Sequence, residues 1–107
     1  MTPEVAGAVD EIRAATSCVL LWSRPGMESA LAEYEDAVLA LVGEHGAEVL
    51  QRMRGDGPGG NPLEVQLYKW PSADDLEAYR ADPRRTAMAA QRDRAIARTD
   101  IFPVEIV

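Results

Sequence analysis

The chain has 107 residues, of which 47% are apolar and 27% are charged, as is usual for a single soluble globular domain. Eighteen acidic residues against eleven basic ones give a net charge of −7, which argues against binding to nucleic acid or to an anionic membrane. A single cysteine and a single histidine exclude an internal disulfide and any zinc site built from several of these residues.

The N-terminal residues show no secretory signal pattern, and the apolar runs are too short to cross a bilayer. We therefore expect one cytoplasmic domain over residues 1–107 that uses no metal and no cofactor.

The first half of the chain alternates helical and extended patterns. Thr2 and Pro3 suit the cap and the first turn of a helix, and Pro25-Gly26 marks a turn after a short apolar run. That run is typical of a strand buried on both faces. Gly46 ends a long amphipathic segment. In chain order these patterns predict a helix over 2–15, a strand over 17–23, a helix over 27–45 and a strand over 48–54.

The second half begins with a Gly- and Pro-rich segment, 55–62, which predicts a hairpin connection. Ser72 with Asp75 forms a capping-box pattern, and Asp82-Pro83 is a second helix start. The patterns then predict a strand over 63–70, helices over 73–80 and 83–98, and an edge strand over 101–107.

This order of elements predicts an α+β fold, the ferredoxin-like β-α-β-β-α-β arrangement, preceded by an N-terminal helical extension over 1–16. The four strands would form an antiparallel sheet with helices on one face. Both faces of the strands carry large side chains: Leu20 and Trp22 lie on one face of the first strand, and Tyr68 and Trp70 lie on one face of the third. A bare sheet face with aromatic residues predicts a partner, and a second copy of the chain is the simplest one.

The segment YKWPSADDLEAYRADP, residues 68–83, resembles the dimeric α/β-barrel superfamily, most of all its short uncharacterised members, and is distantly similar to the antibiotic-biosynthesis-type monooxygenases of that superfamily. Those proteins have a Trp at the end of the third strand, then a Ser or Thr, and an aromatic residue or His in the next helix. Trp70, Ser72 and Tyr79 stand at these places. The resemblance implies a homodimer with a pocket between sheet and helices in each subunit. Family members include cofactor-free monooxygenases, lactone isomerases and haem-degrading enzymes.

Two positions depart from the monooxygenase pattern. Tyr68 stands where an acidic residue is common, and Tyr79 stands where a histidine is common. The usual haem ligand is therefore missing.

Arg85 and Arg92 are seven residues apart and share one helix face. They predict an anion clamp for a carboxylate or enolate, or else two arginine stems that lie along the edge of the core. Arg84, Arg94 and Arg98 form a second stripe that we expect to be solvated.

The aromatic residues are candidates for a ligand site in which hydroxyl groups orient a phenolic substrate, or for simple packing. The ligand-binding candidates are Tyr34, Tyr68, Trp70 and Arg85, and the catalytic candidates are Tyr79, His45 and Arg92. His45 falls on the apolar stripe of the predicted helix, near its end. It would act there as a general base or as a metal or haem ligand, or else would interact with the helix dipole and the last carbonyls.

Other polar groups are expected to be structural. Asp74-Asp75 and the cluster Glu33, Glu35 and Asp36 are interpreted as helix caps and solvated surface, and Cys18 as a small hydrophobic residue in a strand.

Two functions remain open at this stage. The first is a homodimeric barrel that binds an aromatic or polyketide-like molecule and acts on it as an oxygenase, isomerase or cyclase. The alternative is a non-catalytic dimeric module whose pocket is filled by its own side chains. A cavity of several hundred Å³ would favour the first.

Overall fold

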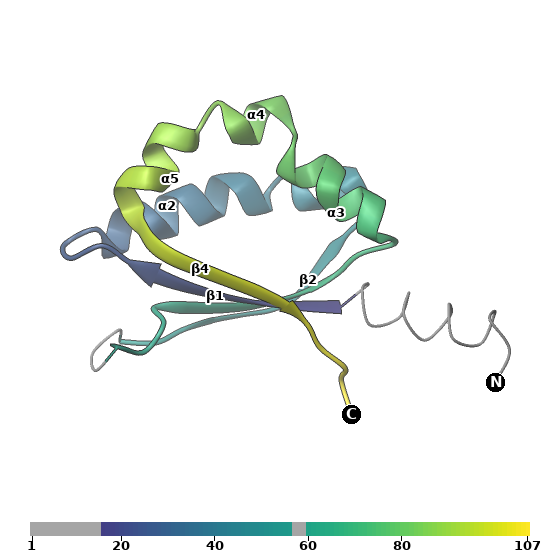
Figure 1. Ribbon diagram of the computed structural model, residues 1–107, viewed down its shortest axis with the longest axis horizontal. Coiled ribbons are helices and arrows are strands. Elements are labelled where there is room, and N and C mark those ends of the chain that lie inside the picture. The colour runs from purple at the N-terminus through teal and green to yellow at the C-terminus, as the bar shows by residue number, and fades with distance from the viewer. Residues whose placement is uncertain (1–15, 57–59) are drawn as a thin grey trace, which may run out of the picture.

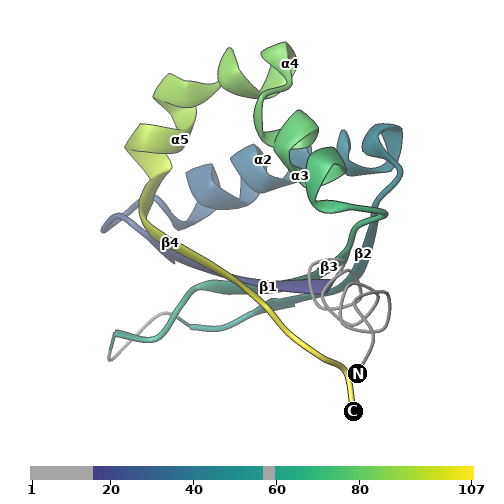
Figure 2. The same cartoon turned by 45° about the vertical axis from the view of Figure 1, so that its right-hand side comes forward.

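The computed structural model describes residues 16–56 and 60–107, and the helix predicted over 2–15 lies outside this part of the chain. Four strands form one antiparallel sheet in the order β2-β3-β1-β4. The helices lie on one side of the sheet in both Figure 1 and Figure 2. This is the predicted ferredoxin-like arrangement. The elements are β1 (Thr16–Ser23), α2 (Glu28–Leu39), η1 (Val42–His45), β2 (Glu48–Arg54), β3 (Glu64–Lys69), α3 (Ala73–Arg80), α4 (Pro83–Thr86), α5 (Ala89–Ala95) and β4 (Ile96–Pro103).

The hydrophobic core lies between the sheet and the helices. Val19 and Leu21 point from β1 toward the helices and are buried, and Leu31 and Val38 of α2 lie against them in the same core. Residues that alternate with Val19 and Leu21 on the other face of β1 are only half-buried. The prediction of a strand buried on both faces was therefore wrong, because the helices cover one face only.

The helix predicted over 27–45 ends at Leu39, and the chain then tightens into the single 3₁₀ turn η1. Gly46 ends this turn with a φ of 78°, a left-handed conformation that favours glycine. A Cβ atom built on Gly46 would lie 3.1 Å from Cγ of Pro71. The stop at Gly46 was predicted correctly, but the last turn is not α-helical, so His45 does not extend the apolar stripe of the helix.

The helix predicted over 83–98 is instead two short helices, α4 and α5, and it ends at Ala95. Ile96 has an extended backbone and pairs with Ser23, so β4 begins there rather than at 101, and it ends at Pro103. The reason is tertiary, because hydrogen bonding along β1 outweighs the helix propensity of an Ala- and Arg-rich segment. β4 is an edge strand, as the proline requires.

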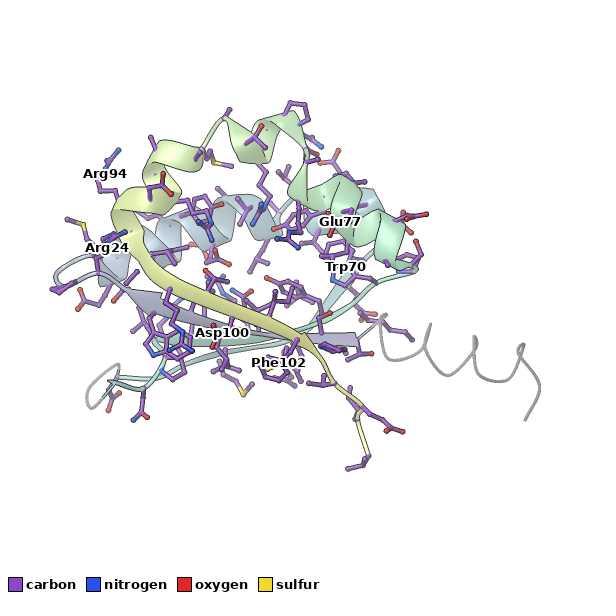
Figure 3. All side chains as sticks on the ribbon, viewed as in Figure 1. Arg24, Trp70, Glu77, Arg94, Asp100 and Phe102 are labelled. Atoms are coloured by element: carbon purple, nitrogen blue, oxygen red, sulfur yellow. The ribbon has the colours of Figure 1, made fainter. Side chains whose placement is uncertain are left out.

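The sheet face away from the helices is partly apolar. Arg98 lies in β4 and not in a solvated helical stripe, with Cζ 4.6 Å from the centre of the Trp22 ring. Tyr68 and Trp70 are buried on the helix side, so they are not on the open face. The open face carries Cys18, Leu20, Trp22, Val65, Leu67 and Phe102, the last of which is labelled on β4 in Figure 3.

Candidate functional site

A cavity of about 420 Å³ lies between the helical layer and the sheet. Side chains from α2, α3, α4 and α5 form one side of it, and side chains from β1, β3 and β4 form the other. The wall includes the predicted site residues Tyr34, Tyr68, Tyr79, Arg85 and Arg92. Elements from both halves of the chain therefore meet around one hollow, as the β-α-β-β-α-β order allows.

Two arginines give the cavity a cationic side. Arg85 of α4 lies with Cζ 5.0 Å from the centre of the Tyr79 ring, and its Nε is buried without a hydrogen-bond partner in the part of the chain that the structure describes. Arg92 of α5 donates from Nη2 to Oγ1 of Thr99 at 3.3 Å. Although the predicted single helix is broken between them, both guanidinium groups reach the same cavity. Guanidinium groups are strong hydrogen-bond donors to anionic oxygens.

Three tyrosines line the cavity but differ in their hydrogen bonds. Tyr79 donates to the carbonyl oxygen of Val38 at 3.2 Å, and Tyr68 donates to Oε1 of Gln66. Tyr34 has a buried hydroxyl with no partner among the described residues. Burial raises the pKa of all three phenols, that of Tyr79 to about 12, so each keeps its proton at neutral pH. Tyr34 is thus the phenol with a free donor.

A buried polar network runs from the cavity toward β2. Gln66 donates from Nε2 to Oε1 of Glu35 and to Oε2 of Glu64, both at 2.8 Å. Glu64 also accepts from Nε of Arg52 at 2.6 Å and from Nη2 of Arg54 at 3.0 Å. The amide of Gln66 therefore bridges two buried carboxyl groups, and only Glu35 lines the cavity.

Glu35 is a buried carboxyl group on the cavity wall that the sequence did not predict there. It was interpreted as solvated surface, but it is 4% exposed and faces the cavity. Burial raises the pKa of its carboxyl group, and the negative charge of Glu64 raises it further, while the hydrogen bond from Gln66 lowers it. The spacing contained a signal, because Glu35 lies four residues after Leu31 and three before Val38, inside the apolar stripe of the helix.

His45 and Trp70 lie behind the cavity wall. His45 Nε2 is 2.8 Å from Oδ2 of Asp82, the residue that caps α4. Trp70, labelled between the sheet and α3 in Figure 3, is 1% exposed. The centre of the Tyr79 ring lies 5.2 Å from the centre of the Trp70 ring and 5.9 Å from the centre of the His45 ring. Both residues support Tyr79 rather than lining the cavity.

The structure gives no metal site to add to this cavity. Within residues 16–56 and 60–107, no three His, Cys, Asp or Glu side chains are grouped so as to hold a metal ion. Cys18 is half-buried, and burial raises the pKa of its thiol. In the same described part of the chain, no helix has the length and apolar character needed to cross a membrane.

The chain matches no protein-family model and no curated protein. Solved structures do resemble it. A protein of unknown function from Rhodopseudomonas palustris has 15% sequence identity and a TM-score of 0.71, and the match covers 100% of this chain and 95% of that one. An uncharacterized NIPSNAP domain protein from Burkholderia xenovorans has 15% sequence identity and a TM-score of 0.69, and the match covers 86% of this chain and 93% of that one.

A third structure is described as a dimeric protein of unknown function and ferredoxin-like fold, from Bacteroides fragilis. It has 16% identity and a TM-score of 0.63, and the match covers 85% of this chain and 94% of that one. Similarity at such low identity is evidence of fold alone. On these comparisons and on its own sheet order, the chain has a ferredoxin-like α+β fold.

Proposed function

We propose that the protein is a homodimer that binds a small organic anion, aromatic or polyketide-like, in the cavity of each subunit. The observation that carries the proposal is a cavity whose wall holds two buried donors with no partner within residues 16–56 and 60–107, Nε of Arg85 and the hydroxyl of Tyr34. An unpaired buried donor costs about 1–3 kcal/mol, and an acceptor oxygen on a ligand would remove that cost.

The size and lining of the cavity support a small ligand. Its volume of about 420 Å³ falls in the range of roughly 300–1,000 Å³ that is usual for small-molecule sites. The rings of Tyr34, Tyr68 and Tyr79 suit an aromatic or conjugated molecule, and Arg85 and Arg92 suit a carboxylate or enolate oxygen on it. This open volume favours a ligand-binding protein over a module with a filled pocket.

The open sheet face supports a homodimer. It combines half-buried and exposed apolar side chains on β1, β3 and β4, and Phe102 is 43% exposed there. Contiguous apolar surface of this kind marks an association site. The similar Bacteroides fragilis protein is described as dimeric, and the resemblance of residues 68–83 to dimeric α/β-barrel monooxygenases implies the same assembly.

Phenylpyruvate is a suitable probe for the cavity, because it joins an aromatic ring to a carboxylate. We expect titration calorimetry to detect its binding, with phenylacetone, which has a methyl group in place of the carboxylate, binding at least about tenfold more weakly. Arg92→Gln is expected to weaken phenylpyruvate about 10- to 100-fold, since hydrogen bonds to charged groups contribute about 1.5–3 kcal/mol.

Arg94→Gln is the matched control, because Arg94 is an exposed arginine on the same helix. Equal affinity for phenylpyruvate and phenylacetone, or no loss in Arg92→Gln, would contradict the anion site. The double variant Tyr79→Phe with Arg92→Ala provides a second check. If it bound phenylpyruvate like the wild type, the assigned wall of the cavity would be wrong.

Native mass spectrometry tests the assembly. We expect twice the chain mass for the wild type and the single chain mass for Phe102→Glu, because a buried, unpaired charge at the interface is costly. Ala90→Glu, at an exposed position of α5 in the helical layer, should remain dimeric. A monomeric wild type would rule out the dimer.

A further inference from the structure

We infer that Glu35 is a catalytic acid–base group that moves a proton on a carbon acid bound in the cavity, so that the protein catalyses enolisation next to a carbonyl group. The inference rests on the proposed binding of an organic anion. It adds the reaction, the reacting group and the substrate class: a carbonyl compound with an acidic C–H bond.

The geometry leaves one carboxylate oxygen of Glu35 free. Oε1 accepts the hydrogen bond from Gln66, and Oε2 has no side-chain hydrogen bond among the described residues. The carboxyl group has no ion-pair partner within that same part of the chain. Gln66 is in turn fixed by Tyr68 and Glu64, so the Glu35 carboxyl group is positioned from behind. A general base requires this combination of a fixed group and an open oxygen in the site.

The electrostatic surroundings suit a base that works near neutral pH. The charged groups around Glu35 are Glu64 on β3, Arg52 on β2 and Arg85 on α4. Burial and the charge of Glu64 raise the pKa of Glu35, and the two arginines lower it, with a net rise. A carboxyl group shifted in this direction holds an abstracted proton more readily than a solvated one.

The other polar groups on the cavity wall can stabilise the negative charge that develops on the substrate oxygen during enolisation. When the Glu35 carboxylate takes a proton from the carbon next to a carbonyl, the C–H electron pair forms a C=C bond and the carbonyl oxygen becomes an enolate. Arg85, Arg92 and the hydroxyl of Tyr34 line the same cavity and can donate to that oxygen or to a neighbouring carboxylate. Protonated Glu35 then returns the proton, to the same carbon for exchange or to another carbon for isomerisation. The step is redox-neutral.

Proton NMR in D₂O tests the step directly. The benzylic C–H protons of phenylpyruvate exchange with solvent only through the enol or enolate. We expect the wild type to exchange them faster than buffer alone, and Glu35→Gln to slow the enzymatic rate at least about 100-fold, as is typical for removing a general base. The amide of the variant can still accept the hydrogen bond from Gln66, so the variant should fold like the wild type. Its affinity for phenylpyruvate, measured by calorimetry, should stay within about threefold of the wild-type value.

Glu33→Gln is the control, because it removes one exposed carboxylate from the same helix and should exchange at the wild-type rate. Glu35→Asp should retain part of the rate, and the wild-type rate should rise with pH as Glu35 loses its proton. Binding without exchange, or an unchanged rate in Glu35→Gln, would overturn the role of Glu35 and leave the binding proposal intact. Failure of the wild type to bind phenylpyruvate would overturn both.

Discussion

Glu64 and Glu35 lie on either side of one amide and are buried in opposite ways. Each accepts a hydrogen bond of 2.8 Å from Nε2 of Gln66, and both are at most 4% exposed. Glu64 has two arginine partners, Arg52 and Arg54, within 3.0 Å. Glu35 has none among the described residues, and it faces the cavity instead. A buried carboxylate that forms ion pairs with arginines is typical of a structural role. A buried carboxyl group that has no such partner and lines a cavity is typical of a functional site.

The same contrast extends to the tyrosines. The Tyr68 hydroxyl donates a hydrogen bond to Gln66, whereas the Tyr34 hydroxyl is buried with no partner among the residues that the structure describes. Among the described residues, two buried donors without a partner belong to the cavity wall, the hydroxyl of Tyr34 and Nε of Arg85, and two lie outside it, Nη2 of Arg52 and Nε1 of Trp70. A ligand in the cavity would supply partners to the two donors on the wall.

The largest change in stability should come from removing the Glu64 carboxylate. Glu64→Gln leaves Arg52 and Arg54 without their shared carboxylate, and we expect it to lower the free energy of unfolding by about 3 kcal/mol. The loss should be at the lower end for a buried pair, because both arginines reach solvent. Glu35→Gln should change stability by less than about 0.5 kcal/mol or increase it, since no ion pair is lost.

Urea denaturation measures the free energy of unfolding of both variants. An unchanged m-value would show that only this free energy has changed. Glu77→Gln is a matched control, because Glu77 forms an exposed ion pair with Arg80 at 3.4 Å and should matter little. Equal losses for Glu64→Gln and Glu35→Gln would show that the two carboxyl groups are held in the same way, and the comparison would fail.

The pH dependence of stability sharpens the comparison further. The pKa of Glu35 is raised in the folded state above its usual value of 4.5, chiefly by burial. Below 4.5 both states carry the proton, so the group has no effect. As the pH rises from there to the folded pKa, the unfolded state loses its proton first, and stability falls. Glu35→Gln lacks this loss, so its stability relative to the wild type should grow with pH and then level off.

Denaturation curves of both proteins between about pH 4 and about pH 8 check this expectation. Asp82 acts in the opposite sense: hydrogen bonds from Arg84 and His45 lower its pKa, and its contribution is lost only as the pH falls below 3.8. It is present in both proteins and cancels in the difference. A difference that shrinks as the pH rises would mean that the Glu35 carboxylate is stabilised in the folded protein.

The sequence predicted those features that depend on local chemistry. β2 was predicted at its observed bounds, and Ser72 accepts a hydrogen bond from the backbone N–H of Asp75, as the capping box indicates. The order of elements then determined the sheet topology. The end of the last helix was predicted wrongly because it is set by pairing between β4 and β1, which are far apart in the chain.

The sequence predicted that some of the candidate residues would lie close together, and it did not predict that Glu35 would join them. Arg85 and Arg92 were linked by helical spacing, and that spacing survives the break between α4 and α5 well enough to place both at the cavity. Glu35 was missed because composition marks a glutamate as surface, and only packing shows that β3 presents a glutamine and a second glutamate opposite it. A polar residue inside an apolar stripe is the pattern to examine in such chains.

The smallest effects should separate the two phenols. Tyr68→Phe removes the donor to Oε1 of Gln66 and should cost about 1–2 kcal/mol of unfolding free energy. Tyr34→Phe removes a hydroxyl that has no partner in the described part of the chain, so the stability of this variant should stay within about 0.5 kcal/mol of the wild type. With phenylpyruvate, Tyr34→Phe should instead lose about fivefold in affinity, the value of one hydrogen bond. Urea denaturation and calorimetry on the same two variants decide the matter. A loss of stability in Tyr34→Phe equal to that in Tyr68→Phe would mean that its hydroxyl has a partner in the folded protein, and the cavity wall would then lack one of the two donors assigned to a ligand.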